Sequence, residues 1–200
     1  MAQLDVLAFP DPRLRRRAEP VRVFDAELGR LVDDLLETLH ATRAIGLAAT
    51  QVDVHRQVLV IDLSGGAAPP EVFVNPRIVA RHRYGMVEES CLSLPGLVDS
   101  VQRPIALRVR YADRAGREHE RELDGMLAVC LQHEIDHLQG TLFLDRLPFF
   151  RRLRARRRLR AALQGRELAL GSRTPAGAGR GTHPAVGVPQ QPFQSAEVSR

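Results

Sequence analysis

Two histidines and a glutamate form the most chemically suggestive pattern in the chain. The sequence His133-Glu134-Ile135-Asp136-His137 fits H-E-x-x-H, and on a helix its two histidines lie one turn apart on one face. Both imidazoles can then reach one metal ion, while Glu134 can exchange a proton with water beside the metal without binding the metal itself. The alternative is a surface helix that carries these residues by chance, because short motifs also occur without function.

A catalytic metal site needs a third protein ligand and one open position. The long metalloprotease motif would place a histidine where Phe143 stands, and Glu167 lies at the end of an arginine-rich segment. Cys91 is the better candidate, because a thiolate completes a set of two nitrogens and one sulfur. An inert buried thiol is the alternative for Cys91, and Cys130 is interpreted as a core residue. No secretory signal is evident, so a disulfide between the two cysteines is not expected.

The candidate residues need helices and strands to position them. A helix is predicted from Asp124, a suitable N-cap, to Gly140, a suitable C′ residue, and an amphipathic helix over residues 24–42. Strands are predicted from β-branched or alternating apolar residues over residues 58–63, 71–79, 105–111 and 118–123, the last two as an antiparallel hairpin. This order predicts an α+β domain.

Arginine is concentrated beyond this predicted domain. The chain has 200 residues and a formal net charge of +5, and residues 151–160 contain seven arginines interrupted by Leu153, Ala155 and Leu159. We predict a basic amphipathic helix, which is either a solvated face or a surface that docks on ribosomal RNA. No stretch is long enough to span a membrane.

The composition therefore divides the chain into three parts. We expect a metal-dependent catalytic domain over residues 1–150 and an arginine-rich helix over residues 151–170. Glycine, proline and polar residues dominate residues 171–200, which are expected to be a disordered tail.

Three segments of the chain together resemble the motifs of the peptide deformylases. They are Ala44-Ile-Gly-Leu-Ala-Ala-Thr-Gln51, Glu89-Ser-Cys-Leu-Ser93 and Gln132-His-Glu-Ile-Asp-His-Leu-Gln-Gly140, in the order and approximate spacing of that family. The similarity runs from residue 6 to residue 146. It implies a peptide-deformylase-like α+β fold, with antiparallel or mixed β-sheets around a central H-E-x-x-H helix and a basic C-terminal helix.

The resemblance also implies an activity. The chain is expected to be a cytoplasmic, monomeric hydrolase that removes the formyl group from the N-terminal formylmethionine of nascent polypeptides and releases formate. Cys91, His133 and His137 would hold one divalent metal ion, with Fe(II) favoured and Zn(II) as its substitute, and a metal-bound water would attack with Glu134 as general acid and base. The nascent chain is the expected partner, with the ribosome as a second one through residues 151–160.

Further site residues follow from the same resemblance. The metal, the Gln51 side-chain amide and the Leu92 backbone N–H would stabilise the oxyanion, and Gly46 would let the substrate backbone approach closely. The residues implied to line the methionine pocket, each of which also fits an ordinary core, are Ile45, Val87 and Val129. Asp136 is interpreted as structural and paired with Arg103.

Two departures and two other functions are part of this interpretation. Ala44 and Ser90 stand where the family usually has glycine, so the cleft could be narrower by one methyl group and the strand beside Cys91 stiffer. Neither change removes a ligand, but both bear on the rate.

A zinc endoprotease that shares H-E-x-x-H is one alternative function, and a non-catalytic RNA-binding protein is the other.

Overall fold

The computed structural model describes residues 2–171, and describes side chains as far as residue 163. The helices are α1 (Ala26–Thr42), α2 (Gly125–Leu138) and α3 (Phe149–Gly171), with three 3-10 turns, η1 (Pro12–Arg15), η2 (Ala49–Val52) and η3 (Phe143–Arg146). The strands are β1 (Gly46–Ala48), β2 (Val58–Ile61), β3 (Glu71–Ser90), β4 (Val98–Ala112) and β5 (Glu118–Asp124). They form one antiparallel sheet in the order β1-β2-β3-β4-β5, which confirms the predicted α+β class. Apart from residue 171, the predicted disordered tail lies outside the described residues.

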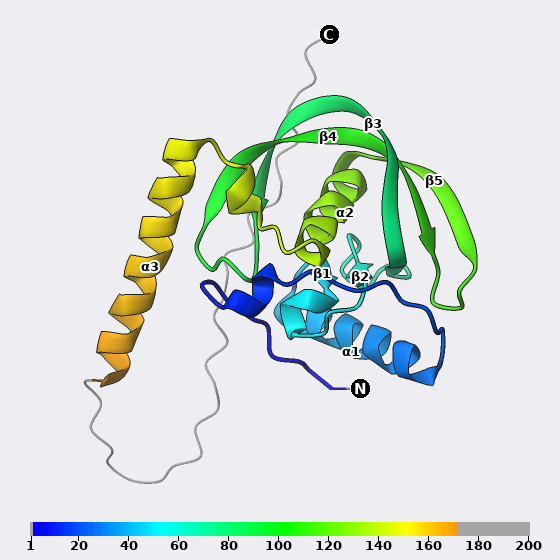
Figure 1. Cartoon of the computed structure of the whole chain (residues 1–200), viewed down its shortest axis with the longest axis horizontal. Coiled ribbons are helices and arrows are strands. Elements are labelled where there is room, and N and C mark those ends of the chain that lie inside the picture. The colour runs from blue at the N-terminus through cyan, green and yellow to red at the C-terminus, as the bar shows by residue number, and fades with distance from the viewer. Residues whose placement is uncertain (1, 172–200) are drawn as a thin grey trace.

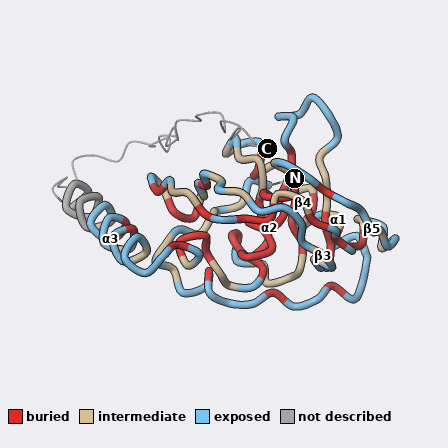
Figure 2. Tube along the Cα trace, turned by 90° about the horizontal axis from the view of Figure 1, so that it is seen from above, coloured by how far each residue is buried: buried red, intermediate tan, exposed pale blue. Residues whose placement is uncertain are grey.

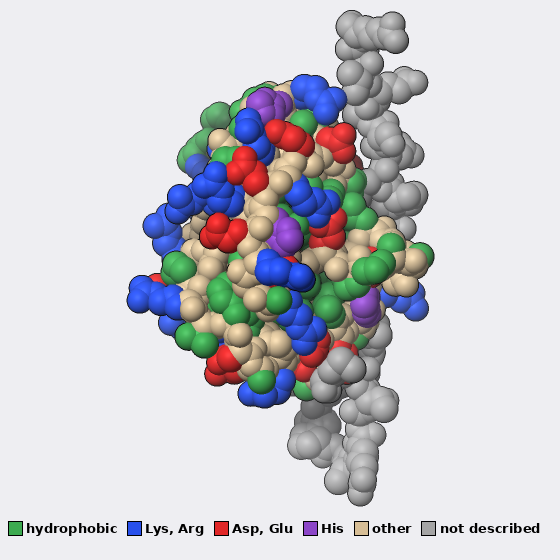
Figure 3. All heavy atoms as spheres, turned by 90° about the vertical axis from the view of Figure 1, so that its right-hand side faces the viewer, with side chains coloured by type: hydrophobic (Ala, Val, Ile, Leu, Met, Phe, Trp, Pro, Cys, Tyr) green, Lys and Arg blue, Asp and Glu red, His purple; other side chains and the backbone are tan. Residues whose placement is uncertain are grey.

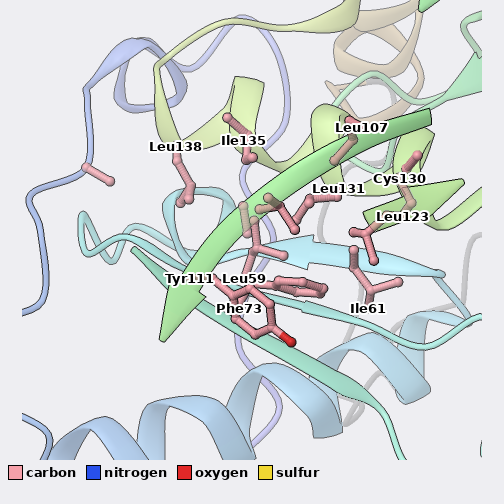
Figure 4. Close-up of a cluster of buried hydrophobic side chains, with 14 residues drawn as sticks. Leu59, Ile61, Phe73, Leu107, Tyr111, Leu123, Cys130, Leu131, Ile135 and Leu138 are labelled. Atoms are coloured by element: carbon pink, nitrogen blue, oxygen red, sulfur yellow. The ribbon is translucent and has the colours of Figure 1, made fainter. Parts of the chain in front are cut away.

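The strand β2 separates two layers of the core. Successive side chains of a strand point to opposite faces, and all four side chains of β2 are buried. Val58 and Val60 belong to the hydrophobic cluster that includes the apolar face of α1. Leu59 and Ile61 belong to the cluster that includes α2, which Figure 4 shows in close-up. The two helices therefore lie on opposite sides of this part of the sheet.

The helix α2 is the central element of the structure. All its side chains from residue 128 to residue 138 are buried, and Figure 2 shows this stretch in red near the middle of the molecule. The long strands β3 and β4 arch over it, whereas α3 projects at the side (Figure 1). Polar groups on α2 are thus shielded from water and need partners within the protein.

Both predicted ends of this helix are confirmed. Asp124 is its N-cap residue, in extended backbone conformation. At the other end Gln139 is the C-cap, and Gly140 follows with a φ of +71°. Glycine adopts this left-handed conformation readily. A Cβ at Gly140 would lie 2.3 Å from the carbonyl oxygen of Arg15, so the tight contact with η1 also requires glycine.

The strand predictions were wrong in extent. The predicted strand 71–79 continues in β3 to Ser90, and the predicted strand 105–111 begins in β4 at Val98. The extra residues of β3 include exposed charged side chains at Arg81 and Arg83, which lack the apolar alternation of a half-buried strand. Pairing with β4 makes them a strand. The three-residue strand β1 was not predicted at all.

Charge of both signs covers the outer edge of the sheet. In Figure 3, which views the molecule from the β5 side, arginine and acidic side chains are interspersed. Arg110 of β4 donates to Glu120 of β5 at 2.7 Å, and Arg108 lies 3.0 Å from Glu122. Such charges discourage an edge strand from pairing with another chain. Within residues 2–171, no helix has the length and apolar character needed to cross a membrane.

Replacing Gly140 by alanine should destabilise the protein strongly, because alanine meets both the unfavourable φ and the Arg15 carbonyl. Urea denaturation would measure the free energy of unfolding. The matched control is Gly65→Ala, because Gly65 has a φ of +64° and open space around its Cα. The control should lower the free energy of unfolding by about 1 kcal/mol, which is the effect of the left-handed conformation alone. Gly140→Ala should lower it by at least twice as much. Equal losses would show that the contact with Arg15 adjusts freely.

Candidate metal centre

Two consecutive turns of α2 and the end of β3 bring three ligand groups together. His133 and His137 are both buried, and their ring centroids lie 5.0 Å apart. Cys91 follows directly after β3, with its Sγ 3.1 Å from Nε2 of His137. One ligand atom from each residue lies within 4.8 Å of the others, and this is the only such group of three found among the described residues. Both cysteines are free.

The chemistry of these groups fits a transition-metal ion. Ligand atoms that share one tetrahedral ion lie about 3.3–3.7 Å apart, given metal–nitrogen and metal–sulfur bonds of about 2.0–2.3 Å. Sγ of Cys91 and Nε2 of His137 are 3.1 Å apart, and no two ligand atoms of the group are more than 4.8 Å apart. Burial lowers the pKa of His137 well below its usual value, which favours the neutral imidazole that binds a metal ion. The Cys91, His133 and His137 side chains can therefore hold one ion, and three protein ligands leave one tetrahedral position for a non-protein ligand.

A buried carboxylate fixes the orientation of His133. Nδ1 of His133 lies 2.7 Å from an oxygen of Glu89 on β3, which leaves Nε2 for the metal. Arg103 of β4 donates to both oxygens of Glu89, at 2.6 and 3.0 Å. Burial tends to raise the pKa of Glu89, but the hydrogen bonds from His133 and Arg103 lower it to about 2. The sequence interpretation gave Glu89 no role, although this residue lies in the quoted motif two positions before Cys91.

The same arginine extends the network to a second acid. Nη1 of Arg103 donates to Asp136 at 2.7 Å, as expected from the resemblance, and Arg146 of η3 also donates to Asp136. Asp136 therefore has a structural partner on each side and is not directed at the ligand group. Such an arrangement around a metal-binding histidine keeps the ring from turning.

Glu134 lies against β1. Burial raises its pKa to about 7, so the carboxyl group can both give and take a proton near neutral pH. A Cβ at Gly46 would lie 2.5 Å from Oε1 of Glu134 and 2.7 Å from Sγ of Cys130. Glycine is therefore required at position 46 by the Glu134 and Cys130 side chains themselves, a reason that the sequence interpretation did not give. Burial raises the pKa of the Cys130 thiol, which agrees with its interpretation as a core residue.

Two hydrogen-bond donors lie near the ligand group. Nε2 of Gln51, a residue of η2, is 3.8 Å from Sγ of Cys91. The backbone N–H of Leu92, the residue after Cys91, makes no hydrogen bond within the described part of the chain. Nε2 of Gln51 therefore lies beside the ligand group, and Leu92 is next to Cys91 in the chain.

The other expected residues lie on the surrounding elements. Val129 is buried on α2, whereas Val87 is partly buried on β3. Ile45, just before β1, packs on the hydrophobic cluster that contains Cys130. Two residues depart from the family pattern. Ala44 packs on the hydrophobic cluster that includes the apolar face of α1, and Ser90 is exposed at the end of β3.

The basic helix is attached to the rest of the protein by one apolar face. Ala155 and Leu159 are buried in a hydrophobic cluster that Cys91 also contacts. Arg156 donates to Asp145 of η3 at 3.1 Å. Four exposed arginines of α3 make no hydrogen bond or ion pair within the described residues, namely Arg154, Arg157, Arg158 and Arg160.

Comparison with known proteins identifies the relatives of the chain. A sequence profile of the family described as polypeptide deformylase matches residues 3–152. A peptide deformylase of Hahella chejuensis is 50% identical over 160 residues, which cover 80% of this chain and 95% of the relative. A peptide deformylase of Alkalilimnicola ehrlichii is 47% identical over 175 residues, which cover 87% and 98%.

Solved structures give the same result. The crystal structure of a peptide deformylase from Legionella pneumophila has a TM-score of 0.77 and 42% sequence identity, and the match covers 87% of this chain and 100% of that one. The Ehrlichia chaffeensis peptide deformylase in complex with actinonin has a TM-score of 0.72 and 38% identity, with coverage of 87% and 100%. The expected family and fold are therefore confirmed.

Replacing Glu89 by glutamine should lower the affinity for the metal ion by about 10- to 100-fold, as is usual when the partner of a metal-binding histidine is lost. Competition with a chelator for Zn(II) would measure the effect. Glu88→Gln is the matched control, because it makes the same chemical change at the exposed neighbouring position and should leave the affinity unaltered. Equal affinities of the two variants would contradict the proposed support of His133.

Proposed function

The chain belongs to the peptide deformylase family, and we propose that Cys91, His133 and His137 hold its metal ion while Glu134 transfers the proton. The function of the family, and of this chain, is removal of the N-terminal formyl group from nascent polypeptides. The observation that best supports the assignment of the site is the convergence of a thiolate and two imidazoles within 4.8 Å, directly beside a buried glutamate.

A bound divalent ion would act as a Lewis acid that polarises the formyl carbonyl and makes water more acidic. Two nitrogens and one sulfur suit either Fe(II) or Zn(II). The resemblance to the family favours Fe(II), which is therefore the proposed ion, with Zn(II) as its substitute. The family implies a single metal ion, and the candidate site offers one set of ligands among the described residues.

The chain's own groups would divide the remaining work. With a pKa of about 7, Glu134 can accept a proton when water attacks the formyl carbon and return it to the departing amine. The Gln51 amide and the Leu92 N–H would donate to the oxygen that becomes negative in the transition state. Ile45, Val87 and Val129 are proposed to bind the methionine side chain, and Gly46 keeps the wall beside Glu134 free of a side chain.

The two alternative functions find no support in the comparisons. The relatives at 50% and 47% identity and the structural neighbours at 42% and 38% identity are all peptide deformylases. We therefore retain neither the endoprotease nor the non-catalytic RNA-binding function.

The proposal includes a role for the C-terminal helix. Residues 1–150 would form the catalytic domain of a monomeric cytoplasmic enzyme, and residues 151–170 would dock it on the ribosome. The exposed, unpaired arginines Arg154, Arg157 and Arg158 support this role, because arginine clusters bind the phosphates of RNA. All three side chains are exposed, which leaves them accessible.

The activity test is release of formate from a formyl-Met-Ala-Ser peptide by anaerobically purified protein of measured metal content. Glu134→Gln should lower kcat by about 10²–10⁴-fold, because it removes the proton carrier but preserves the size of the side chain. The metal content should stay the same. A metallated Glu134→Gln variant with full activity would exclude Glu134 as the proton carrier, whereas a fully metallated but inactive parent protein would argue against formyl removal by this chain.

Ribosome docking can be tested separately. The triple change of Arg154, Arg157 and Arg158 to alanine should weaken ribosome binding and reduce its dependence on salt, because up to three phosphate contacts are lost. Hydrolysis of the short formyl peptide should be unaffected. Alanine at Arg22, Arg77 and Arg81, which are exposed elsewhere, removes the same charge and is the matched control. Ribosome co-sedimentation that weakens equally in both variants would reveal only a general charge effect.

A further inference from the structure

A backbone N–H decides which way the side-chain amide of Gln51 faces. Gln51 is buried, and its Oε1 accepts the backbone N–H of Ala48 at 2.9 Å. A backbone N–H can only donate, so the amide oxygen must face Ala48 and the amide nitrogen must point the other way. This places Nε2 on the side of Cys91 and Ser93.

Nε2 carries two hydrogens with different surroundings. One is donated to Oγ of Ser93, 3.2 Å from Nε2. The other is on the side of the candidate metal centre, where Sγ of Cys91 lies 3.8 Å from Nε2. Ser93 is completely buried. Its hydroxyl therefore occupies one N–H of Gln51 without competition from bulk water and leaves the second N–H for a group at the metal centre.

Backbone hydrogen bonds join Gln51 and Ser93 to one segment near the N-terminus. The N–H of Leu7 donates to the carbonyl of Gln51 at 2.7 Å, and the N–H of Phe9 donates to the carbonyl of Ser93 at 2.8 Å. Leu7 and Phe9 are only two positions apart, so one short segment binds both carbonyls. The separation of η2 from the turn after Cys91 is thereby fixed, and Ser93 stays within reach of Gln51.

We propose that Ser93 is the positioning residue for the Gln51 amide: its buried hydroxyl holds one N–H so that the other points at the developing oxyanion. This inference rests on the proposed oxyanion role of Gln51. A donor held in place before the reaction needs no reorganisation in the transition state, which is where such a donor contributes to the rate. Without the hydroxyl, only the Ala48 N–H and the contact of Nε2 with Cys91 Sγ would hold the amide.

The kinetic test compares Ser93→Ala with the parent enzyme on the short formyl peptide. We expect kcat to fall on the order of tenfold with KM nearly unchanged, because the loss is smaller than the 10²–10³-fold that removal of an oxyanion donor costs. Ser93→Thr, which keeps the hydroxyl, should recover most of the rate. Ser100→Ala is the control, because Ser100 uses its backbone N–H and not its hydroxyl for its hydrogen bond.

A double-mutant cycle separates positioning from a merely structural effect. If Ser93 acts through Gln51, Ser93→Ala should cause no further loss in a Gln51→Ala background. An equal further loss in that background would overturn the inference. Full activity of Gln51→Ala would instead reject the oxyanion role of Gln51, and full activity of Ser93→Ala in a protein that needs Gln51 would reject only the positioning role.

A readout without catalysis completes the test. In the zinc-loaded protein, the side-chain amide protons of Gln51 can be assigned by NMR from their absence in Gln51→Ala. We expect one of them to exchange slowly with solvent in the parent and in Ser93→Thr, and faster in Ser93→Ala. Identical exchange in the parent and in Ser93→Ala would contradict the hydrogen bond on which the inference depends.

Discussion

The structure depends on one constraint, which is that the helix with the chemically reactive groups is also the centre of the core. Two histidines and two acids of α2 are buried with its apolar side chains. A buried charge is tolerated only when it is paired and hydrogen-bonded. Arg103 meets this requirement for Asp136 and for Glu89, and Glu89 in turn binds His133. Loss of one partner from such a network costs about 3–5 kcal/mol, so the network contributes to folding as well as to the site.

The length of the β3–β4 hairpin follows from this constraint. Glu89 and Arg103 must both reach the far side of α2, and they do so from paired strands, with Gly85 opposite Arg103 and Glu89 opposite Asp99. Residues of odd number at this end of β3 point toward α2, because side chains alternate along a strand. The same alternation directs Glu88 and Ser90 outward. A shorter hairpin would leave Asp136 with Arg146 as its only arginine partner and Glu89 with none.

The extent to which the sequence predicts this structure differs between its parts. The ends of α2 and the two histidines follow from local rules, because capping and helical spacing depend only on neighbouring residues. Cys91 was proposed as a ligand from its chemistry and from resemblance, although it lies 42 positions before His133. Glu89 was missed, because an acid in a strand normally indicates a solvent-exposed position. Glu89 reaches His133 only because the sheet arches over α2.

The N-terminal segment shows how the fold joins parts of the site that no local pattern connects. Leu7 and Phe9 read as ordinary apolar residues, and they do pack in the core. Their backbone N–H groups, however, bind the carbonyls of Gln51 and Ser93, one on η2 and one on the turn after Cys91. These two segments carry the proposed oxyanion donor and lie beside a candidate metal ligand. Since no sequence pattern specifies such backbone pairing, the placement of Gln51 beside Cys91 is a property of the tertiary structure, and its precision depends on a segment that carries no reactive side chain.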